Sequence, residues 1–253
     1  MQAGALISWI FPSVLLSLRI APVFALAPPF SLTPAPLLFR MLFGVGLASI
    51  LAVSHPASVM LPDVSVGALA SVGFRELFIG SIFVLAFQLT FGALYMAGRT
   101  VDIQAGFGLA MLIDPTTRTQ TPLVGTIYAY AAGAMFFAMN GPSELLGVFT
   151  ASIEAIPLGA GQLPGSLGPL FGFMSAIFLA GFGVAGGAIL CLFLADISIA
   201  MLSRTVPQMN VLVLGFQAKT MITLLVLPAT LGLSTALLAR MMRLTLEALP
   251  RLL

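Results

Sequence analysis

The chain has 253 residues, of which 60% are hydrophobic and only 7% are charged, whereas an ordinary soluble domain carries about 25% charged residues. Its mean hydropathy is +1.14. So little charge cannot cover the surface of a water-soluble fold, and the sequence therefore predicts an all-α, polytopic membrane protein. The formal net charge is only +2 and the basic residues are scattered, so we expect no nucleic acid among the partners.

Long uncharged stretches divide the chain, and most reach the roughly 18–20 residues that a helix needs to cross a bilayer. We therefore predict about six hydrophobic helices. These helices are expected to be partly bent or broken, because interior prolines remove backbone donors, above all near the N terminus. The uncharged stretches are Ile20–Phe39, Met41–Pro62, Leu77–Gly98, Thr119–Ser143, Ala155–Ala195 and Thr220–Ala239.

The helix boundaries follow from turn residues. Prolines between residues 28 and 36 predict a turn after the first helix, and Asn140-Gly141-Pro142 ends the fourth. The only long loop that contains polar residues is expected at Gly98–Pro122. The six helices are expected at about Ala5–Leu26, Leu37–Val53, Val72–Ala97, Leu123–Met139, Leu170–Leu202 and Val211–Met242.

Basic residues give conflicting signals about orientation in the membrane. Arg240, Arg243 and Arg251 favour a cytoplasmic C terminus, because basic residues mark the cytoplasmic side. Six complete spans would then place Arg99 and Arg118 on the opposite side. The conflict predicts that some of the helices do not span the membrane.

Residues for catalysis are nearly absent. His55 is the single histidine, and no paired-histidine metal motif, nucleophile elbow or phosphate-binding loop occurs. We therefore predict a protein that is not an enzyme and has no catalytic, metal-binding or cofactor-binding residues and no bound cofactor. A carboxylate dyad stays open among Asp102, Asp114, Glu144, Glu154 and Asp196.

Two further patterns concern helix packing. Gly183 and Gly187 have the small-residue spacing that lets two helix backbones approach closely, within the chain or between subunits. Arg19, Asp196 and Lys219 lie inside hydrophobic runs, where a charge costs about 2.5–3.5 kcal/mol on insertion scales. We expect these charges to pair inside the chain or across subunits; an ion or proton path is the alternative.

Four segments of unusual residues stand in order along the chain. They are Arg19–Phe24 with Arg40, Arg75–Gly80, Ala97–Ala110 with Asp114-Pro115 and Gln120–Pro122, and Ala195–Ile197 with Arg204–Val211, Gly215 and Lys219. Together these segments resemble the motifs of the FliR/SctT family of type III protein-export subunits. The resemblance covers about residues 19–220, and one departure is Pro142-Ser143, where many relatives carry histidines.

The resemblance implies a multi-pass subunit of the bacterial inner membrane and the flagellar basal body, with one export-gate domain over residues 1–253. It implies a helical hetero-oligomeric gate with the P, Q and B subunits (FliP, FliQ and FlhB), through which unfolded flagellar proteins pass. A gate core above the membrane plane would explain the orientation conflict. An injectisome export subunit and a stand-alone small-molecule or ion permease stay open as alternatives.

The resemblance also suggests two sets of functional residues. Glycines that fold back tightly and deformable apolar side chains would form a pore plug, with a static packed connector as the alternative. The plug residues are Gly106, Phe107, Gly108, Leu109, Met111, Asp114 and Pro115. Assembly contacts are expected at Arg19, Arg75, Glu76, Asp196, Arg204, Pro207, Gln208, Asn210 and Lys219, of which Asp196, Arg204 and Lys219 would fix the packing of the fifth and sixth helices.

Overall fold

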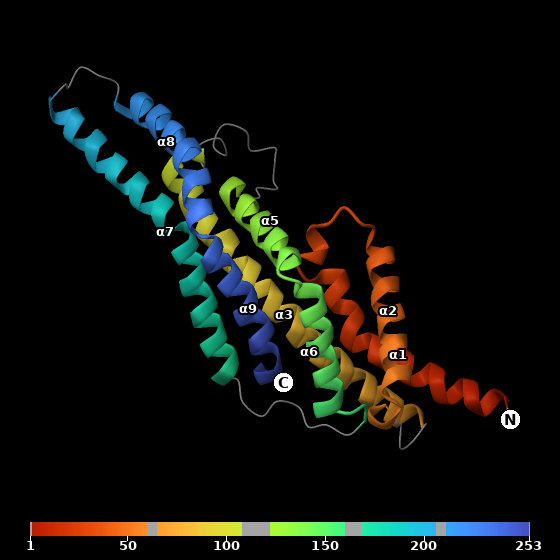
Figure 1. Ribbon diagram of the computed structural model, residues 1–253. Helices are drawn as coiled ribbons and strands as arrows, with labels where there is room; N and C mark the ends of the chain where they lie inside the picture. The colour runs from red at the N-terminus through yellow and green to blue at the C-terminus, as the bar shows by residue number, and fades with distance from the viewer. Residues whose placement is uncertain (1, 60–64, 108–121, 160–167, 206–210, 253) are drawn as a thin grey trace. The chain divides into compact units, whose positions relative to one another are not determined.

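The computed structural model describes residues 2–59, 65–107, 122–159, 168–205 and 211–252, and these residues contain helices and no strand (Figure 1). The all-α prediction is confirmed. Five of these helices are long and apolar enough to cross a membrane, or six if α5 and α6 count as one broken span, as predicted. The helices are α1 (Gln2–Leu26), η1 (Phe30–Leu32), α2 (Leu37–Ser54), η2 (Pro56–Ser58), α3 (Val66–Ala105), α5 (Leu123–Ala138), α6 (Gly141–Ala155), α7 (Gly168–Thr205), α8 (Val211–Leu233) and α9 (Thr235–Leu252).

The first two helices and the turn between them agree with the sequence prediction, with one difference. α1 contains Pro12 and Pro22 and continues through both, so the chain is not broken there. The turn that follows is tied back to α1, because Nη1 of Arg40 in α2 donates a 2.9 Å hydrogen bond to the carbonyl oxygen of Ala25. A basic side chain thus supplies a hydrogen-bond donor to a backbone carbonyl near the end of α1.

The prediction of a loop from Gly98 onward is wrong at its start, because α3 continues to Ala105. In the sequence, Gly98 indicated the end of the third helix and the start of the loop. In the structure it lies in the helix instead, where its missing side chain lets α3 contact the backbone of Gly125 in α5. Residues 108–121 of the expected loop lie outside the described residues.

The predicted break at Asn140 is confirmed, and a helix follows it that the sequence reading missed. Asn140 has a left-handed backbone (φ 58°) and ends the helical run. Helix α6 then begins, with Pro142 in its first turn and Glu144 beside its positive N-terminal end. Both are helix-start signals that could have revealed α6.

The prediction of one sixth helix over Val211–Met242 is also wrong. The chain forms α8, turns at Ser234 and continues as α9. The two helices differ in character, because α9 buries Met241 and Met242 while Arg240 and Arg243 are exposed. The sharp division into a buried apolar side and an exposed charged side is typical of an amphipathic helix.

The chain divides into two compact units, and the first comprises residues 1–89, 136–174 and 242–253. Its core contains a cluster of phenylalanine rings around Phe24, whose centroid lies 4.7 Å from that of Phe30 and 5.1 Å from that of Phe43. Phe149 of α6 joins the cluster and packs on Phe83 of α3, at 5.0 Å. Aromatic contacts of this kind stabilise the packing of α1, α2, α3 and α6.

The second unit comprises residues 90–135 and 175–241, in which α7 and α8 form an antiparallel pair (Figure 1). Ile199 packs against Gly215 near one end of the pair, and Thr230 packs against Gly187 further along. An ideal Cβ on Gly187 would lie 2.9 Å from the Thr230 methyl group. Tight packing at the Gly183/Gly187 pattern is therefore confirmed, and it occurs within the chain.

Three helices leave most of their surface uncovered by the rest of the chain. In the most apolar 18-residue stretch of each helix, only 22% of α2, 33% of α7 and 22% of α8 is buried by the rest of the chain. The corresponding share for α1 is 56%. Large exposed side chains such as Leu38, Leu179 and Leu225 project from these faces. Apolar surface of this extent requires lipid or partner subunits to cover it.

The contact between α1 and α2 gives a matched pair of glycines for a stability test. An ideal Cβ on Gly44 would lie 2.6 Å from the Ala21 Cα, whereas Gly46 in the same helix faces open space. We expect Gly44→Ala to destabilise the protein, because overpacking costs about 1–3 kcal/mol. Gly46→Ala should be neutral or slightly stabilising, because alanine is the better helix former. The midpoint of thermal unfolding of the purified membrane protein measures both effects, and equal midpoints for the two variants would contradict the close packing.

Candidate functional site

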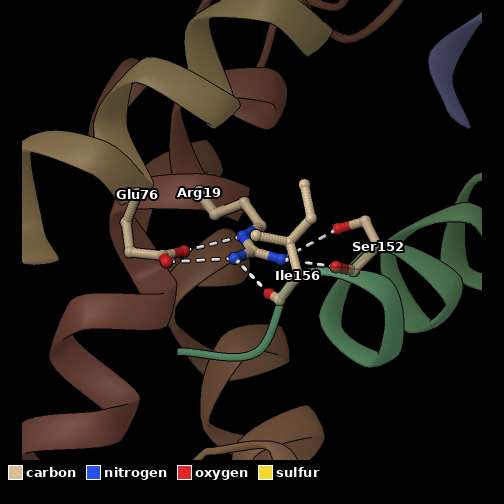
Figure 2. Close-up of polar contacts among 4 residues, drawn as sticks. All are labelled: Arg19, Glu76, Ser152 and Ile156. Atoms are coloured by element: carbon tan, nitrogen blue, oxygen red, sulfur yellow. Dashed lines mark hydrogen bonds and ion pairs between the residues drawn. The ribbon is translucent and has the colours of Figure 1, made fainter. Parts of the chain in front are cut away.

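A buried arginine in the first unit makes polar contacts with two other helices, α3 and α6. Arg19 and Glu76 are both completely buried. The guanidinium forms a two-pronged ion pair with the carboxylate, with Nε 2.6 Å from Oε2 and Nη2 3.0 Å from Oε1. Figure 2 shows the guanidinium between Glu76 on one side and Ser152 and Ile156 on the other.

The remaining donors of Arg19 hold the end of α6. Nη1 donates to the Ser152 carbonyl at 2.9 Å and to the Ser152 hydroxyl at 3.1 Å. Nη2 donates to the Ile156 carbonyl at 3.0 Å. The Ser152 carbonyl also accepts a hydrogen bond from the backbone N–H of Ile156, at 3.0 Å. Carbonyls at a helix C terminus carry partial negative charge. The guanidinium therefore adds charge-assisted hydrogen bonds at the end of α6, while its own charge is balanced by Glu76.

A glycine brings α3 close enough for this ion pair to form. An ideal Cβ on Gly80 would lie 2.7 Å from the carbonyl oxygens of both Leu18 and Arg19, so only a glycine fits without movement of the backbone. Pro22 has no N–H to donate to the Leu18 carbonyl, four residues earlier. The motif Arg19–Phe24 and the motif Arg75–Gly80 thus form two sides of one contact between α1 and α3.

The pairing of Arg19 inside the chain agrees with the sequence interpretation of this buried charge. Sequence reasoning singled out Arg19 and Glu76 but missed Ser152 and Ile156. Two of the three oxygens that these residues contribute are backbone carbonyls, which no side-chain motif reveals. Arg75 lies next to Glu76 on α3 and is partly exposed; its role in assembly stays a prediction.

A second ion pair joins α7 to α8 in the second unit. The Lys219 ammonium contacts Oδ1 of Asp196, and both side chains are partly exposed. The pair lies on the same antiparallel contact as Ile199 and Gly215, so it can fix the register of the two helices, as the sequence suggested.

Of the predicted assembly residues between this pair in sequence, the structure describes only Arg204. Arg204 is exposed near the end of α7. Pro207, Gln208 and Asn210 lie outside the described residues. The part that these residues and the ion pair play in assembly stays a prediction.

The described residues of the predicted plug lie where α3 ends. Gly106 has a left-handed backbone (φ 85°), and an ideal Cβ there would lie 2.8 Å from the Phe216 ring of α8. Phe107 follows and is partly exposed. The other predicted plug residues lie outside the described residues: Gly108, Leu109, Met111, Asp114 and Pro115.

The carboxylates considered for catalysis take up separate structural positions where the structure describes them. Asp102 accepts hydrogen bonds at the start of α5, Asp196 pairs with Lys219, and Glu154 lies 3.8 Å from His55. No group of three or more histidine, cysteine or acidic side chains that could hold a metal ion occurs among the described residues.

Comparison with known proteins decides which family this arrangement belongs to. The sequence model of the family described as "Bacterial export proteins, family 1" matches residues 10–245, nearly the whole chain. The chain belongs to this family. The resemblance to FliR/SctT proteins drawn from the motifs is thereby confirmed.

Individual relatives agree with the family match. The chain is 27% identical over 252 residues to the flagellar biosynthetic protein FliR of Bacillus subtilis, which covers 96% of this chain and 95% of that protein. It is 25% identical to FliR of Escherichia coli, over 89% of this chain and 82% of that protein. The Yop proteins translocation protein T of Yersinia pestis is 29% identical, over 60% of each chain.

The Arg19 contacts predict a severe effect of removing one partner. We expect Glu76→Gln to destabilise the protein by about 3–5 kcal/mol, the usual cost of leaving a buried charge without its partner. The double variant Arg19→Met with Glu76→Met should lose less than the sum of the two single changes, because it leaves neither charge unpaired. Thermal unfolding and the amount of intact protein in membranes measure these losses. The control is Glu154→Gln, whose carboxylate is largely exposed, and a loss as large as that of Glu76→Gln would refute the explanation.

Proposed function

We propose that the chain is a subunit of the flagellar type III protein-export gate and forms part of the channel for unfolded flagellar proteins. The observation that supports this most is the match to the B. subtilis flagellar protein over almost the full length of both chains. The injectisome relatives support the same class of apparatus, but their matches cover about 60% of each chain. The flagellar system is therefore the better assignment.

The buried charges support a scaffold within a conduit more than a permease. Arg19 has its donors engaged by Glu76, Ser152 and Ile156, and Lys219 pairs with Asp196. A proton or ion path requires groups that can change partners or protonation state, and intramembrane charges of that kind face a cavity. Charges tied to helix ends and to each other serve instead to hold helices together.

The exposed apolar faces of α2, α7 and α8 support assembly with other membrane subunits. FliP, FliQ and FlhB are the partners that we propose, in the bacterial inner membrane and the flagellar basal body. Lipid would cover the surfaces that these partners leave open. The whole chain, residues 1–253, would act as one export-gate domain within this assembly.

Loss of the chain should therefore abolish flagellar protein export. Deleting its gene in the source bacterium should remove hook and filament proteins from the culture medium, while these proteins are still made in the cell. A plasmid copy of the gene should restore export, and an affinity tag on it should recover FliP and FliQ from detergent-solubilised membranes. Normal flagellar export in the deletion strain, together with loss of injectisome secretion or of solute uptake, would overturn the proposal.

Within the gate, we propose that the segment from Gly106 to Pro122 acts as a plug. The support from the described residues is the position of its ends. α3 ends at a left-handed glycine covered by the Phe216 ring, and α5 begins beside α3 at the Gly98–Gly125 contact. The apolar residues of the segment would seal against ions yet yield to a passing chain.

Removing the plug should open the gate without preventing its assembly. We expect deletion of Gly108–Thr117 to leave the complex assembled and to make the membrane leak ions or small solutes. Gly106→Asp should leak less than the deletion, because it changes only the start of the segment. The leak can be measured as dye or ion release from vesicles that contain the purified complex, with the wild-type complex as control. An assembled deletion variant with no added leak and unchanged export would show that the segment is a static connector.

A further inference from the structure

Arg40 of α2 carries a charge that the described part of the chain leaves without a counter-charge. Its Nη1 donates to the Ala25 carbonyl, whereas its Nε is buried with no hydrogen-bond partner. No ion pair joins Arg40 to an acidic side chain among the described residues, and neither α1 nor α2 contains an acidic residue. The guanidinium therefore keeps its full charge and most of its N–H donors without a partner.

Arg19 shows what the same arrangement of donors binds elsewhere in the first unit. Its Nη1 also donates to a backbone carbonyl, and its Nε and Nη2 together hold the two carboxylate oxygens of Glu76. Nε and Nη2 form one flat, two-pronged edge of a guanidinium, which matches a carboxylate or a phosphate. In Arg40 neither atom of this edge has a partner among the described residues. The chemistry of the edge points to an anion that offers two oxygens.

The start of α2 adds partial positive charge beside Arg40. Pro36, which precedes the helix, provides no side-chain hydrogen bond to the first turn. The N–H groups of Leu37, Leu38 and Phe39 have no acceptor within the described residues. Helical side chains lean toward the N-terminal end of their helix, so the guanidinium of the fourth residue extends toward these groups. An anion at this place is stabilised by the helix start as well as by the arginine.

The lengths of α1 and α2 place Arg40 near the edge of the hydrocarbon layer. The two helices form a hairpin (Figure 1), and their apolar stretches Trp9–Leu26 and Leu37–Ser54 have 18 residues each. Each stretch is about 27 Å long, close to the roughly 30 Å hydrocarbon core of a bilayer. The turn between them then lies at one membrane surface, and Arg40 follows it within one helical turn. Trp9 at the opposite end is exposed, as is common for tryptophan at a membrane interface.

We propose that Arg40 and the start of α2 bind the phosphate of a phospholipid headgroup. Leu38 and Leu42 on the same helix are 68% and 60% exposed, so an acyl chain can lie against them while the phosphate contacts the guanidinium. A long arginine side chain reaches from an apolar helix surface to the headgroups in this way. Every phospholipid brings a phosphate to this depth, whereas a partner's carboxylate would have to be buried beside the hydrocarbon at a cost in free energy.

Lipid binding to the purified full-length protein tests the site. Native mass spectrometry in a neutral detergent measures the dissociation constant of the first bound phosphatidylglycerol, with diacylglycerol as a matched lipid that lacks the phosphate. We expect Arg40→Gln to weaken phosphatidylglycerol binding about tenfold, the factor that corresponds to about 1.4 kcal/mol for one charge-assisted hydrogen bond. Diacylglycerol binding should be weak and unchanged. Arg40→Lys keeps the charge and a donor for Ala25, and it should still weaken phosphatidylglycerol binding because an ammonium lacks the two-pronged edge.

Gln88→Ala is the matched control for the hydrogen bond to α1. The Gln88 Nε2 donates to the Leu26 carbonyl at 2.9 Å, next to the Ala25 carbonyl that Arg40 holds. The variant therefore removes a hydrogen bond from the same helix end but leaves the arginine in place. Arg240→Gln removes an exposed arginine from α9 instead. Both controls should bind phosphatidylglycerol as the wild type does, and a tenfold loss in either would overturn a site specific to Arg40.

Three further results would overturn the proposal. Equal affinity for phosphatidylglycerol in the wild type and in both Arg40 variants would show that the arginine does not hold the lipid. Displacement of the lipid by inorganic phosphate at the same concentration would assign the site to free phosphate. Unchanged lipid binding, together with loss of a co-purifying subunit from Arg40→Gln, would assign the arginine to a partner's carboxylate. These outcomes do not depend on the export-gate proposal, because a phospholipid site could occur equally in a permease.

Discussion

The guanidinium of Arg19 is the constraint on which the first unit depends. A buried arginine must find acceptors for its donors and a counter-charge, because neither water nor lipid supplies them in an apolar interior. Here three helices meet that need together: α1 carries the arginine, α3 the carboxylate, and α6 the carbonyls. Moving any one of them breaks a charge-assisted contact, so a single side chain fixes the relative placement of all three.

These polar contacts can form only because the backbones of the paired helices lie very close together. Gly80 lets α3 lie against the α1 carbonyls beside Arg19, and Gly98 and Gly125 do the same for α3 and α5 beside Asp102. In both places a glycine contact lies within a few residues of a buried carboxylate. Small residues bring the backbones together, and the charged group then supplies a directional bond that apolar packing alone cannot.

The sequence predicted the helical class and the number of stretches long and apolar enough to cross a membrane, because hydrophobic length is a local property. It failed where a distant contact decided the outcome. Gly98 and Arg99 looked like a helix end, yet α3 continues because Gly125 and the α5 start pack against it. The long sixth helix divides at Ser234, whose hydroxyl donates to the Val184 carbonyl of α7. Arg19, Asp196 and Lys219 could be recognised as charges in need of partners, and Asp196 and Lys219 were expected to fix one helix contact. The carbonyl acceptors of Arg19 at the end of α6 could not be recognised.

Three of the charge sites among the described residues follow one electrostatic rule. The cation Arg19 lies at the C-terminal end of α6, the anion Asp102 lies at the N-terminal end of α5, and Lys219 pairs directly with Asp196. Each charge therefore faces a full or partial charge of opposite sign, as the helix dipole favours. The proposed conduit for unfolded chains would need walls that do not attract its cargo. Charges that are paired within the protein are not available to bind a passing polypeptide. Apolar side chains elsewhere can vary in identity as long as their total volume is kept. This division of roles agrees with relatives that share only 25–27% of their residues over most of the chain.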